Sequence, residues 1–168
     1  TSTPTFNILE LDTLVDRTTD LTVLEQPFSK AEIDRVLQNL PADKAPGPDG
    51  FNTDFVKFCW DIISPDFYAL IDDFFKGTIS LQSINISYIT LIPKKDAPAT
   101  PNDSRPISLL NCSIKIITKL LANRLQTVIL KLVHTNQYGF LKSRSIQDCL
   151  AWSYEFLYQC KSSNQELI

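Results

Sequence analysis

The stretch from Tyr88 to Asn111, YITLIPKKDAPATPNDSRPISLLN, decides the fold of this chain. It begins with an apolar run, YITLI, that is rich in strand-forming residues, and Pro93 ends this run. After a loop with two further prolines, a second run begins at Arg105 with RPISL. The two runs predict an antiparallel β-hairpin, with Lys94 and Arg105 at neighbouring strand ends.

Lys94 and Arg105 together offer a point charge beside a planar guanidinium fork, a combination that suits a polyphosphate. The charges alone favour the alternative, a solvated loop with ordinary surface cations. The wording of this stretch and the segments around it favour the polyphosphate site instead.

The length of 168 residues predicts one domain with ordinary globular composition. No run is long and apolar enough to cross a bilayer, and the N-terminus lacks the pattern of a signal peptide. The chain contains no methionine, so we expect a processed protein or an internal piece of a longer one. The last residues, 164–168, read as the start of an unfinished strand.

The cysteines are irregularly spaced, and His134 is the only histidine. Without a CxxC pair or neighbouring ligands, this pattern argues against a zinc site. Each cysteine lies within or beside an apolar run, which predicts buried free thiols in a reducing compartment. These cysteines are Cys59, Cys112, Cys149 and Cys160.

The net charge of −3 hides a strong asymmetry along the chain. Residues 1–85 carry a net charge of −8, residues 86–144 carry +7, and residues 145–168 carry −2. A basic centre between acidic ends predicts a surface for a polyanion. The sequence pI of about 5.1 argues against a free-standing nucleic-acid binder.

Helical patterns surround the hairpin. Residues 1–27 read as an extended lead-in with at most a short helical turn, and Ser29 with Glu32 predicts the first helix start.

A rigid KAPGPDG turn at 44–50 precedes two predicted helices. The first begins at Asn52 or Thr53, and its predicted inward residues are Phe55, Phe58, Cys59 and Ile62. The other is opened by Ser64-Pro65, packed through Phe67, Leu70, Ile71 and Phe74, and closed by Gly77. Its Asp72-Asp73 pair is interpreted as a solvated helix edge.

A long basic helix is predicted from about Cys112 to Val133, and it carries no acidic residue. Its charges favour a polyanion partner, with a solvated basic face as the alternative. Its predicted buried stripe is Ile114, Ile117, Leu121, Leu125, Val128 and Leu132.

A loop with glycine, aromatic residues and cations follows at 137–144. After it comes a last predicted helix, capped by Ser145 and Asp148. That helix is predicted to pack through Ile146, Cys149, Leu150, Ser153, Phe156 and Cys160.

Five segments in this order resemble the front part of a LINE-type (non-LTR) retrotransposon reverse transcriptase. They are APGPDGF at 45–51, ITLIPKK at 89–95, RPISLLN at 105–111, KIITKLLANRL at 115–125 and QYGFLKSRSIQD at 137–148. Each alone is a weak signal, but RPISLLN after IPKK, followed by QxGF and an arginine, is a strong combination.

The resemblance implies the fingers region of the polymerase and gives roles to particular residues. Lys94 and Arg105 would bind the triphosphate of the incoming dNTP, with Lys95 as the alternative lysine. The residues implied in template binding are Gln137, Gly139, Phe140, Arg144, Lys115 and Lys119.

The family also implies an RNA template, a DNA primer and Mg²⁺ in the complete enzyme. No membrane partner is expected. Two-metal phosphoryl transfer needs carboxylates. The family supplies them from a palm strand and a YxDD hairpin, neither of which occurs here. We therefore expect no catalytic or metal-binding residue in this chain, and no polymerisation by these 168 residues alone.

The predicted fold is α+β and mainly helical, with several helices packed on a small antiparallel hairpin. Residues 28–168 form the partial reverse transcriptase domain. The alternatives are a decayed retroelement remnant acting at most as an RNA-binding module, a helical protein-interaction domain, and a group II intron-type reverse transcriptase. RPISLLN, rather than an RPL-type sequence, argues against the last of these. The sequence does not specify the oligomeric state.

Overall fold

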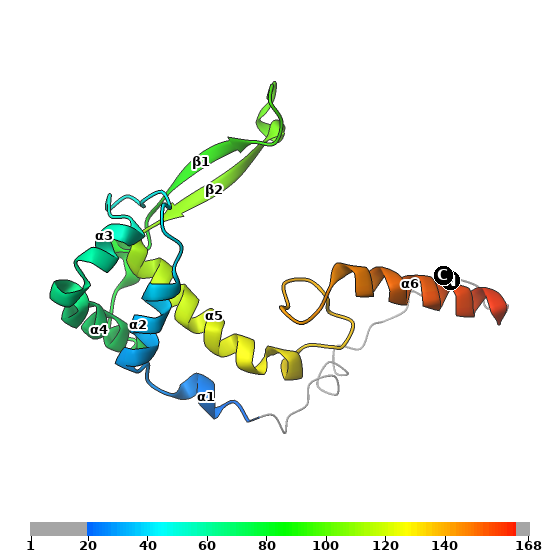
Figure 1. Ribbon diagram of the computed structural model, residues 1–168, viewed down its shortest axis with the longest axis horizontal. Coiled ribbons are helices and arrows are strands. Elements are labelled where there is room, and N and C mark those ends of the chain that lie inside the picture. The colour runs from blue at the N-terminus through cyan, green and yellow to red at the C-terminus, as the bar shows by residue number, and fades with distance from the viewer. Residues whose placement is uncertain (1–19, 164–168) are drawn as a thin grey trace, which may run out of the picture. The chain divides into compact units, whose positions relative to one another are not determined.

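The computed structural model describes residues 20–163 and confirms a mainly helical α+β fold with a two-stranded antiparallel sheet (Figure 1). The predicted strand at the C-terminus and most of the predicted lead-in lie outside the described residues. The elements are α1 (Thr22–Glu25), α2 (Lys30–Asn39), α3 (Thr53–Phe58), α4 (Trp60–Lys76), β1 (Ser87–Pro93), β2 (Ser104–Leu110), α5 (Cys112–Leu132) and α6 (Ile146–Ser162). Two short 3-10 turns, η2 (Leu81–Ser83) and η3 (Pro101–Asp103), flank β1.

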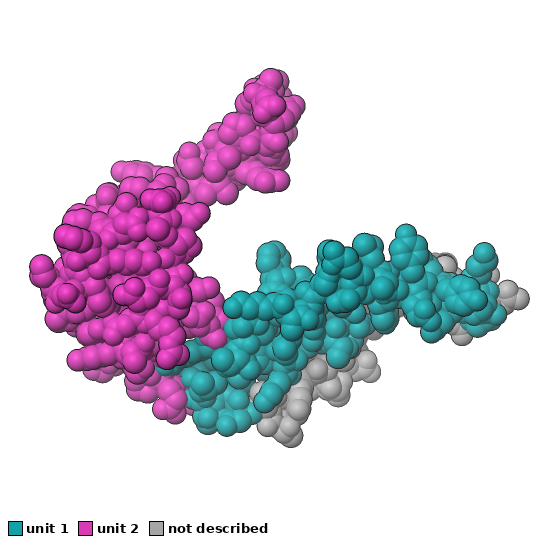
Figure 2. Space-filling view, viewed as in Figure 1, with its two compact units in different colours: residues 1–24, 124–168 teal, residues 25–123 magenta. Residues whose placement is uncertain are grey.

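Two compact units make up the chain (Figure 2). One unit comprises residues 25–123, which include α2 to α4, the hairpin and the first half of α5. The other comprises residues 1–24 and 124–168, with α1, the end of α5 and α6.

The predicted hairpin is confirmed. Strand β1 pairs with β2 in an antiparallel register that sets Thr90 opposite Ile107 and Ile92 opposite Arg105. The hairpin projects from the helices of its unit (Figure 1). Large apolar side chains on its strands, such as Ile89 and Leu91, are exposed.

The core of unit 25–123 is built where α2, α3, α4 and α5 meet. Its buried side chains are Ile33, Val36, Leu37, Val56, Trp60, Ile71, Cys112, Ile116, Ile117 and Leu120. Two partly buried hydrogen bonds join α2 to α4. The Asp34 Oδ1 atom accepts one from Trp60 Nε1 at 2.9 Å and one from the Tyr68 hydroxyl at 2.6 Å. The predicted inward residues Phe67, Leu70 and Phe74 pack against this core.

Three predicted helix ends are confirmed by their hydrogen bonds. The Ser29 hydroxyl accepts from the Glu32 amide at the start of α2, and Asn52 accepts from the Phe55 amide at the start of α3. Gly77 ends α4 with φ of 69°, a left-handed conformation that glycine adopts at little cost. The Asp72-Asp73 pair is exposed, and Asp72 forms a salt bridge with Lys76 one turn later, as a solvated helix edge would.

The predicted helix start at Ser64-Pro65 is wrong, because α4 begins at Trp60 and continues through Pro65. Packing explains the difference. Trp60 lies against Phe67, with ring centroids 5.3 Å apart, and its indole is bound to Asp34, so the first turn is held in place by the core. The inward face predicted before it is also wrong: Phe58 and Ile62 are 89% and 80% exposed, and Phe55 is also exposed.

The predicted bounds of α5 are confirmed to within one residue, but its buried stripe is partly wrong. Leu121 and Leu125 are exposed, whereas Ile116 and Leu120 are fully buried. The apolar residues of α5 lie on most sides of the helix, so the periodicity of its sequence does not determine which side is buried. In α6 only Cys160 is buried, and the predicted packing residues Ile146, Leu150 and Phe156 are exposed.

The four cysteines are free thiols. Cys112 and Cys160 are buried as predicted, while Cys59 and Cys149 are only half-buried. Burial raises the pKa of the Cys112 thiol, so this side chain stays neutral and acts as a small apolar group of the core.

Candidate nucleotide and nucleic-acid interface

The backbone of the hairpin brings Lys94 and Arg105 to the same face. The register ends with Pro93 opposite Ser104, and one residue further the Lys94 amide donates to the Asp103 carbonyl at 2.8 Å. Residues opposite each other in an antiparallel pair point to one face, and side chains two residues apart on a strand share that face. Lys94 and Arg105 are therefore diagonal neighbours across the two strands.

The side chains at the tip separate the two lysines. The Lys95 ammonium forms a salt bridge with Asp103 at 2.8 Å. The Lys94 ammonium instead donates to the Asn102 carbonyl at 2.7 Å, and no acidic side chain among residues 20–163 pairs with its charge. Arg105 is exposed, and no described acidic side chain pairs with it.

Asp103 organises the loop that joins the strands. Its Oδ2 atom accepts from the amides of Ala99 and Thr100, each at 3.0 Å, and from the Thr100 hydroxyl, while its Oδ1 atom holds Lys95. The Lys95 ammonium and these two amides lower the pKa of the Asp103 carboxyl below its ordinary value of 3.8. Sequence reasoning missed this role, although a threonine three residues before an aspartate is a known capping signal.

We expect the hairpin tip to loosen in acid. Because the folded-state pKa of Asp103 is lowered, its contribution to stability is complete above pH 3.8 and is lost as pH falls through the folded-state pKa. An NMR titration of the Asp103 carboxyl carbon should give a midpoint below 3.8, and the amides of Ala99 and Thr100 should lose exchange protection over the same range. In the control Lys95→Ala, the midpoint should move upward. A wild-type midpoint at or above 3.8 would contradict this assignment.

The base of the hairpin is fixed by a buried asparagine that follows β2. The Asn111 Oδ1 atom accepts from the Asp49 amide at 3.2 Å, and its Nδ2 atom donates to the Ile84 carbonyl at 3.0 Å. Gly47 lies so close that a Cβ atom there would be 2.4 Å from the Asn111 amide nitrogen. The sequence identified 44–50 only as a turn, and nothing in it indicated that this turn contacts RPISLLN.

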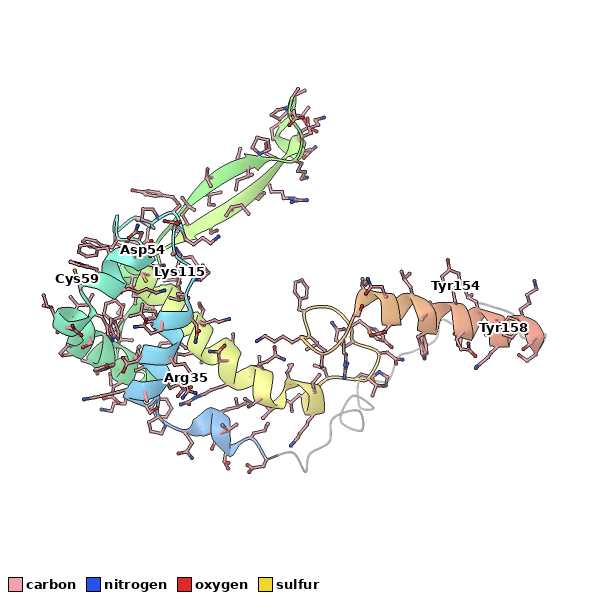
Figure 3. The ribbon with its side chains drawn as sticks, viewed as in Figure 1. Arg35, Asp54, Cys59, Lys115, Tyr154 and Tyr158 are labelled. Carbon is pink, nitrogen blue, oxygen red and sulfur yellow. The ribbon has the colours of Figure 1, made fainter. Side chains whose placement is uncertain are left out.

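The predicted template lysines on α5 differ in their surroundings. Lys115, at the start of the helix (Figure 3), is half-buried and donates to the Ala45 carbonyl at 3.1 Å. This bond ties α5 to the 44–50 turn. Lys119 lies one turn later and is exposed, with no described partner for its ammonium group. Of the two, Lys119 is the freer to meet an anion.

The predicted template loop lies in the other unit, between α5 and α6. The Arg144 Nη1 atom donates to the carbonyls of His134 and Gln137, both at 2.6 Å, so this side chain closes the loop on itself. The Gln137 amide nitrogen donates to the Gly139 carbonyl at 3.3 Å. Phe140, not Gly139, has the left-handed backbone, with φ of 65°, and its side chain is fully exposed.

A phenylalanine with positive φ is strained, and because the Phe140 side chain is fully exposed, burial of its ring within the described part of the chain does not offset that strain. The loop therefore presents an aromatic face to solvent beside the exposed Gln137 and the half-buried Arg144. An unpaired base is a suitable partner for such a face, because every base can stack on an aromatic ring.

Among residues 20–163, no group of three or more His, Cys, Asp or Glu side chains is arranged to hold a metal ion. No helix in the same described range has the length and apolarity needed to cross a membrane.

Comparison with known proteins identifies two similarities. Residues 92–167 match the reverse transcriptase (RNA-dependent DNA polymerase) family. Over 125 residues, or 74% of its length, the chain is 34% identical to the Transposon TX1 uncharacterized 149 kDa protein of Xenopus laevis. The match covers 10% of the length of that protein.

Proposed function

This chain belongs to the reverse transcriptases of the non-LTR retrotransposon type, and we propose that its β1–β2 hairpin binds the triphosphate of an incoming dNTP. Lys94 and Arg105 are the binding residues of this proposal. The complete polymerase would use this segment in RNA-directed DNA synthesis, with an RNA template and a DNA primer as further partners.

The proposal rests on the backbone pairing of the hairpin, from which we infer that Lys94 and Arg105 share one face of its tip. Neither side chain has an acidic partner among the described residues. A guanidinium fork can bind two phosphate oxygens at once, and the lysine adds a mobile charge. Lys95 is less suitable, because its charge is already neutralised by Asp103.

We also propose a template-binding role for the loop at 137–144 and for the basic side of α5. The exposed ring of Phe140 would stack on a base, supported by Gln137 and Gly139, and Lys119 would meet the RNA backbone. Arg144 and Lys115 already hold backbone carbonyls, so their first contribution would be to shape the loop and the start of α5.

Reverse transcriptases as a family use divalent metal ions, and we propose Mg²⁺ for the complete enzyme. Such ions neutralise the triphosphate and activate the primer hydroxyl. The described residues do not provide a fitting carboxylate group, so no metal-binding role is assigned to them. We propose that these 168 residues contribute binding and not the chemical step. EDTA-sensitive incorporation of labelled nucleotide by this chain alone would contradict that division.

The test is kinetic and uses the complete polymerase that contains this segment. Arg105→Ala should raise the KM for dNTP about tenfold, because one charge-assisted contact to phosphate is lost, and leave RNA affinity unchanged. Lys94→Ala should act in the same direction, whereas Lys95→Ala should change the KM less.

Arg35→Ala is the matched control, because Arg35 is an exposed arginine on α2, at a distance from the hairpin (Figure 3). Its KM for dNTP should equal that of the wild type. An unchanged KM in Arg105→Ala would remove the arginine from this role, and a larger effect from Lys95→Ala than from Lys94→Ala would reassign the lysine.

The two similarities taken together support a reverse transcriptase of a transposon. They do not favour the two alternatives, a group II intron-type enzyme and a remnant with RNA affinity alone.

A further inference from the structure

An apolar patch on α3 and α4 lies apart from the hairpin and has no part in the proposed function. We define the α3–α4 patch as the side chains of Phe51, Phe55, Phe58 and Ile62 with the pocket beside them. Phe51 and Phe55 stack with ring centroids 4.8 Å apart, and both remain exposed. Phe58 follows Phe55 by one helical turn, and its side chain is 89% exposed.

The pocket beside this aromatic pair has a volume of about 440 Å³. Its walls are mainly apolar and come from α3, α4 and the start of α5. The lining residues include Phe55, Val56, Ile63, Phe67 and Cys112. A pocket of this size and character accepts one large apolar group, because comparable ligand pockets measure roughly 300–1,000 Å³.

Two carboxylates line the pocket, and two more are adjacent in sequence to residues of the patch. Asp49 and Asp66 line the pocket itself. Asp54 and Asp61 are neighbours in sequence of patch residues, and Lys57 is the only basic residue between Asp49 and Phe75. The Lys57 ammonium is bound to the carbonyls of Gln38 and Leu40 at the end of α2, so it is not free to neutralise this surface.

We propose that the α3–α4 patch is a docking surface for a basic amphipathic segment of a protein partner. A large apolar side chain of the partner would enter the pocket, and lysine or arginine side chains beside it would meet Asp66 and Asp49. Charge decides between classes of partner: the carboxylates repel the phosphates of a nucleic acid and attract a basic peptide. The aromatic side chains supply the buried anchors that dominate the energetics of protein interfaces.

The experiment uses this chain and a synthetic helical peptide with leucine and tryptophan on one face and lysine on the other. A counterpart peptide carries glutamate in place of lysine. Fluorescence anisotropy should show saturable binding of the lysine peptide, at least about tenfold tighter than that of the glutamate peptide.

Two substitutions test the patch directly. Phe58→Ser removes an anchor whose side chain is almost wholly exposed, so the fold should be kept and the thermal midpoint should not change. Asp66→Lys reverses a charge at the pocket. Each should weaken binding of the lysine peptide about tenfold. The matched control is Asp73→Lys, an exposed aspartate on the same helix two turns away, which should change binding less than about twofold.

Several results would overturn the proposal. Equal binding of both peptides, or no saturable binding of the lysine peptide, would contradict the proposal that the partner segment is basic and amphipathic. Equal effects of Asp66→Lys and Asp73→Lys on peptide binding would show that the peptide responds to the overall negative charge of the helix and not to the pocket. Competition by single-stranded RNA would indicate a nucleic acid, and self-association of the chain that Phe58→Ser abolishes would make the occupant a second copy. Because the assay does not involve the hairpin, its failure would leave the dNTP proposal standing.

Discussion

Gly47→Ala is expected to destabilise the chain by about 3 kcal/mol or more, or to prevent folding altogether. A Cβ atom at this position would lie 2.4 Å from the Asn111 amide nitrogen and 2.5 Å from the Leu110 carbonyl carbon. Both are backbone atoms, so no side-chain rotation can relieve the overlap. The strand end and the turn would have to separate, and the Asn111 bonds to Asp49 and Ile84 would be strained or broken.

Two other glycines provide graded controls. Gly50 has φ of 76° and open space around its Cβ position, so Gly50→Ala should cost only about 1–2 kcal/mol of left-handed strain. Gly139 has ordinary space and no positive φ, so Gly139→Ala should be within about 0.5 kcal/mol of the wild type. Urea unfolding followed by circular dichroism measures all three. A Gly47 variant as stable as the Gly139 variant would contradict the close contact.

This contact also bears on function, because it joins two of the segments that identify the chain. Asn111 ends RPISLLN, and Gly47 and Asp49 belong to APGPDGF. The bonds of Asn111 fix the base of the strand that carries Arg105. A weakened junction should therefore also lower dNTP affinity in the complete polymerase, since the binding residues would lose their fixed support.

The second large effect is expected in the core of α5. Leu120→Ala should reduce the free energy of unfolding by about 2–5 kcal/mol, because Leu120 is fully buried among the helices of unit 25–123 and its removal leaves a cavity. Leu121→Ala makes the same chemical change one residue later, where the side chain is 45% exposed, and should cost less than about 1 kcal/mol.

The comparison uses denaturant unfolding of the two variants in parallel. It discriminates between the observed buried face of α5 and the face that periodicity predicted, which contained Leu121 and excluded Leu120. Equal losses for the two variants would contradict the observed buried face, and a larger loss for Leu121→Ala would favour the predicted one. Since the residue type and the helix are the same, helix propensity cancels from the difference.

Helix ends and the hairpin could be predicted from the sequence, because the residues that determine each of them lie close together in the chain. Ser29, Asn52 and Gly77 act at their own helix ends, and Ser145 begins α6, because a cap bonds to amides within a few residues. The hairpin was likewise predictable, since β-forming runs separated by a proline-rich loop have one short-range way to pair.

The sequence by itself determined the mainly helical class, the hairpin and the family, because these depend on local propensity and on the order of short motifs. Only the tertiary structure decided where α4 begins, which face of α5 is buried, and that Gly47 lies against Asn111. These features depend on contacts between residues far apart in the chain, such as Trp60 with Asp34, whose packing and hydrogen bonds override a local helix-start signal at Pro65. The surroundings of the two hairpin lysines were decided in the same way, because only the folded tip brings Asp103 to Lys95, while the Lys94 ammonium bonds to the Asn102 carbonyl.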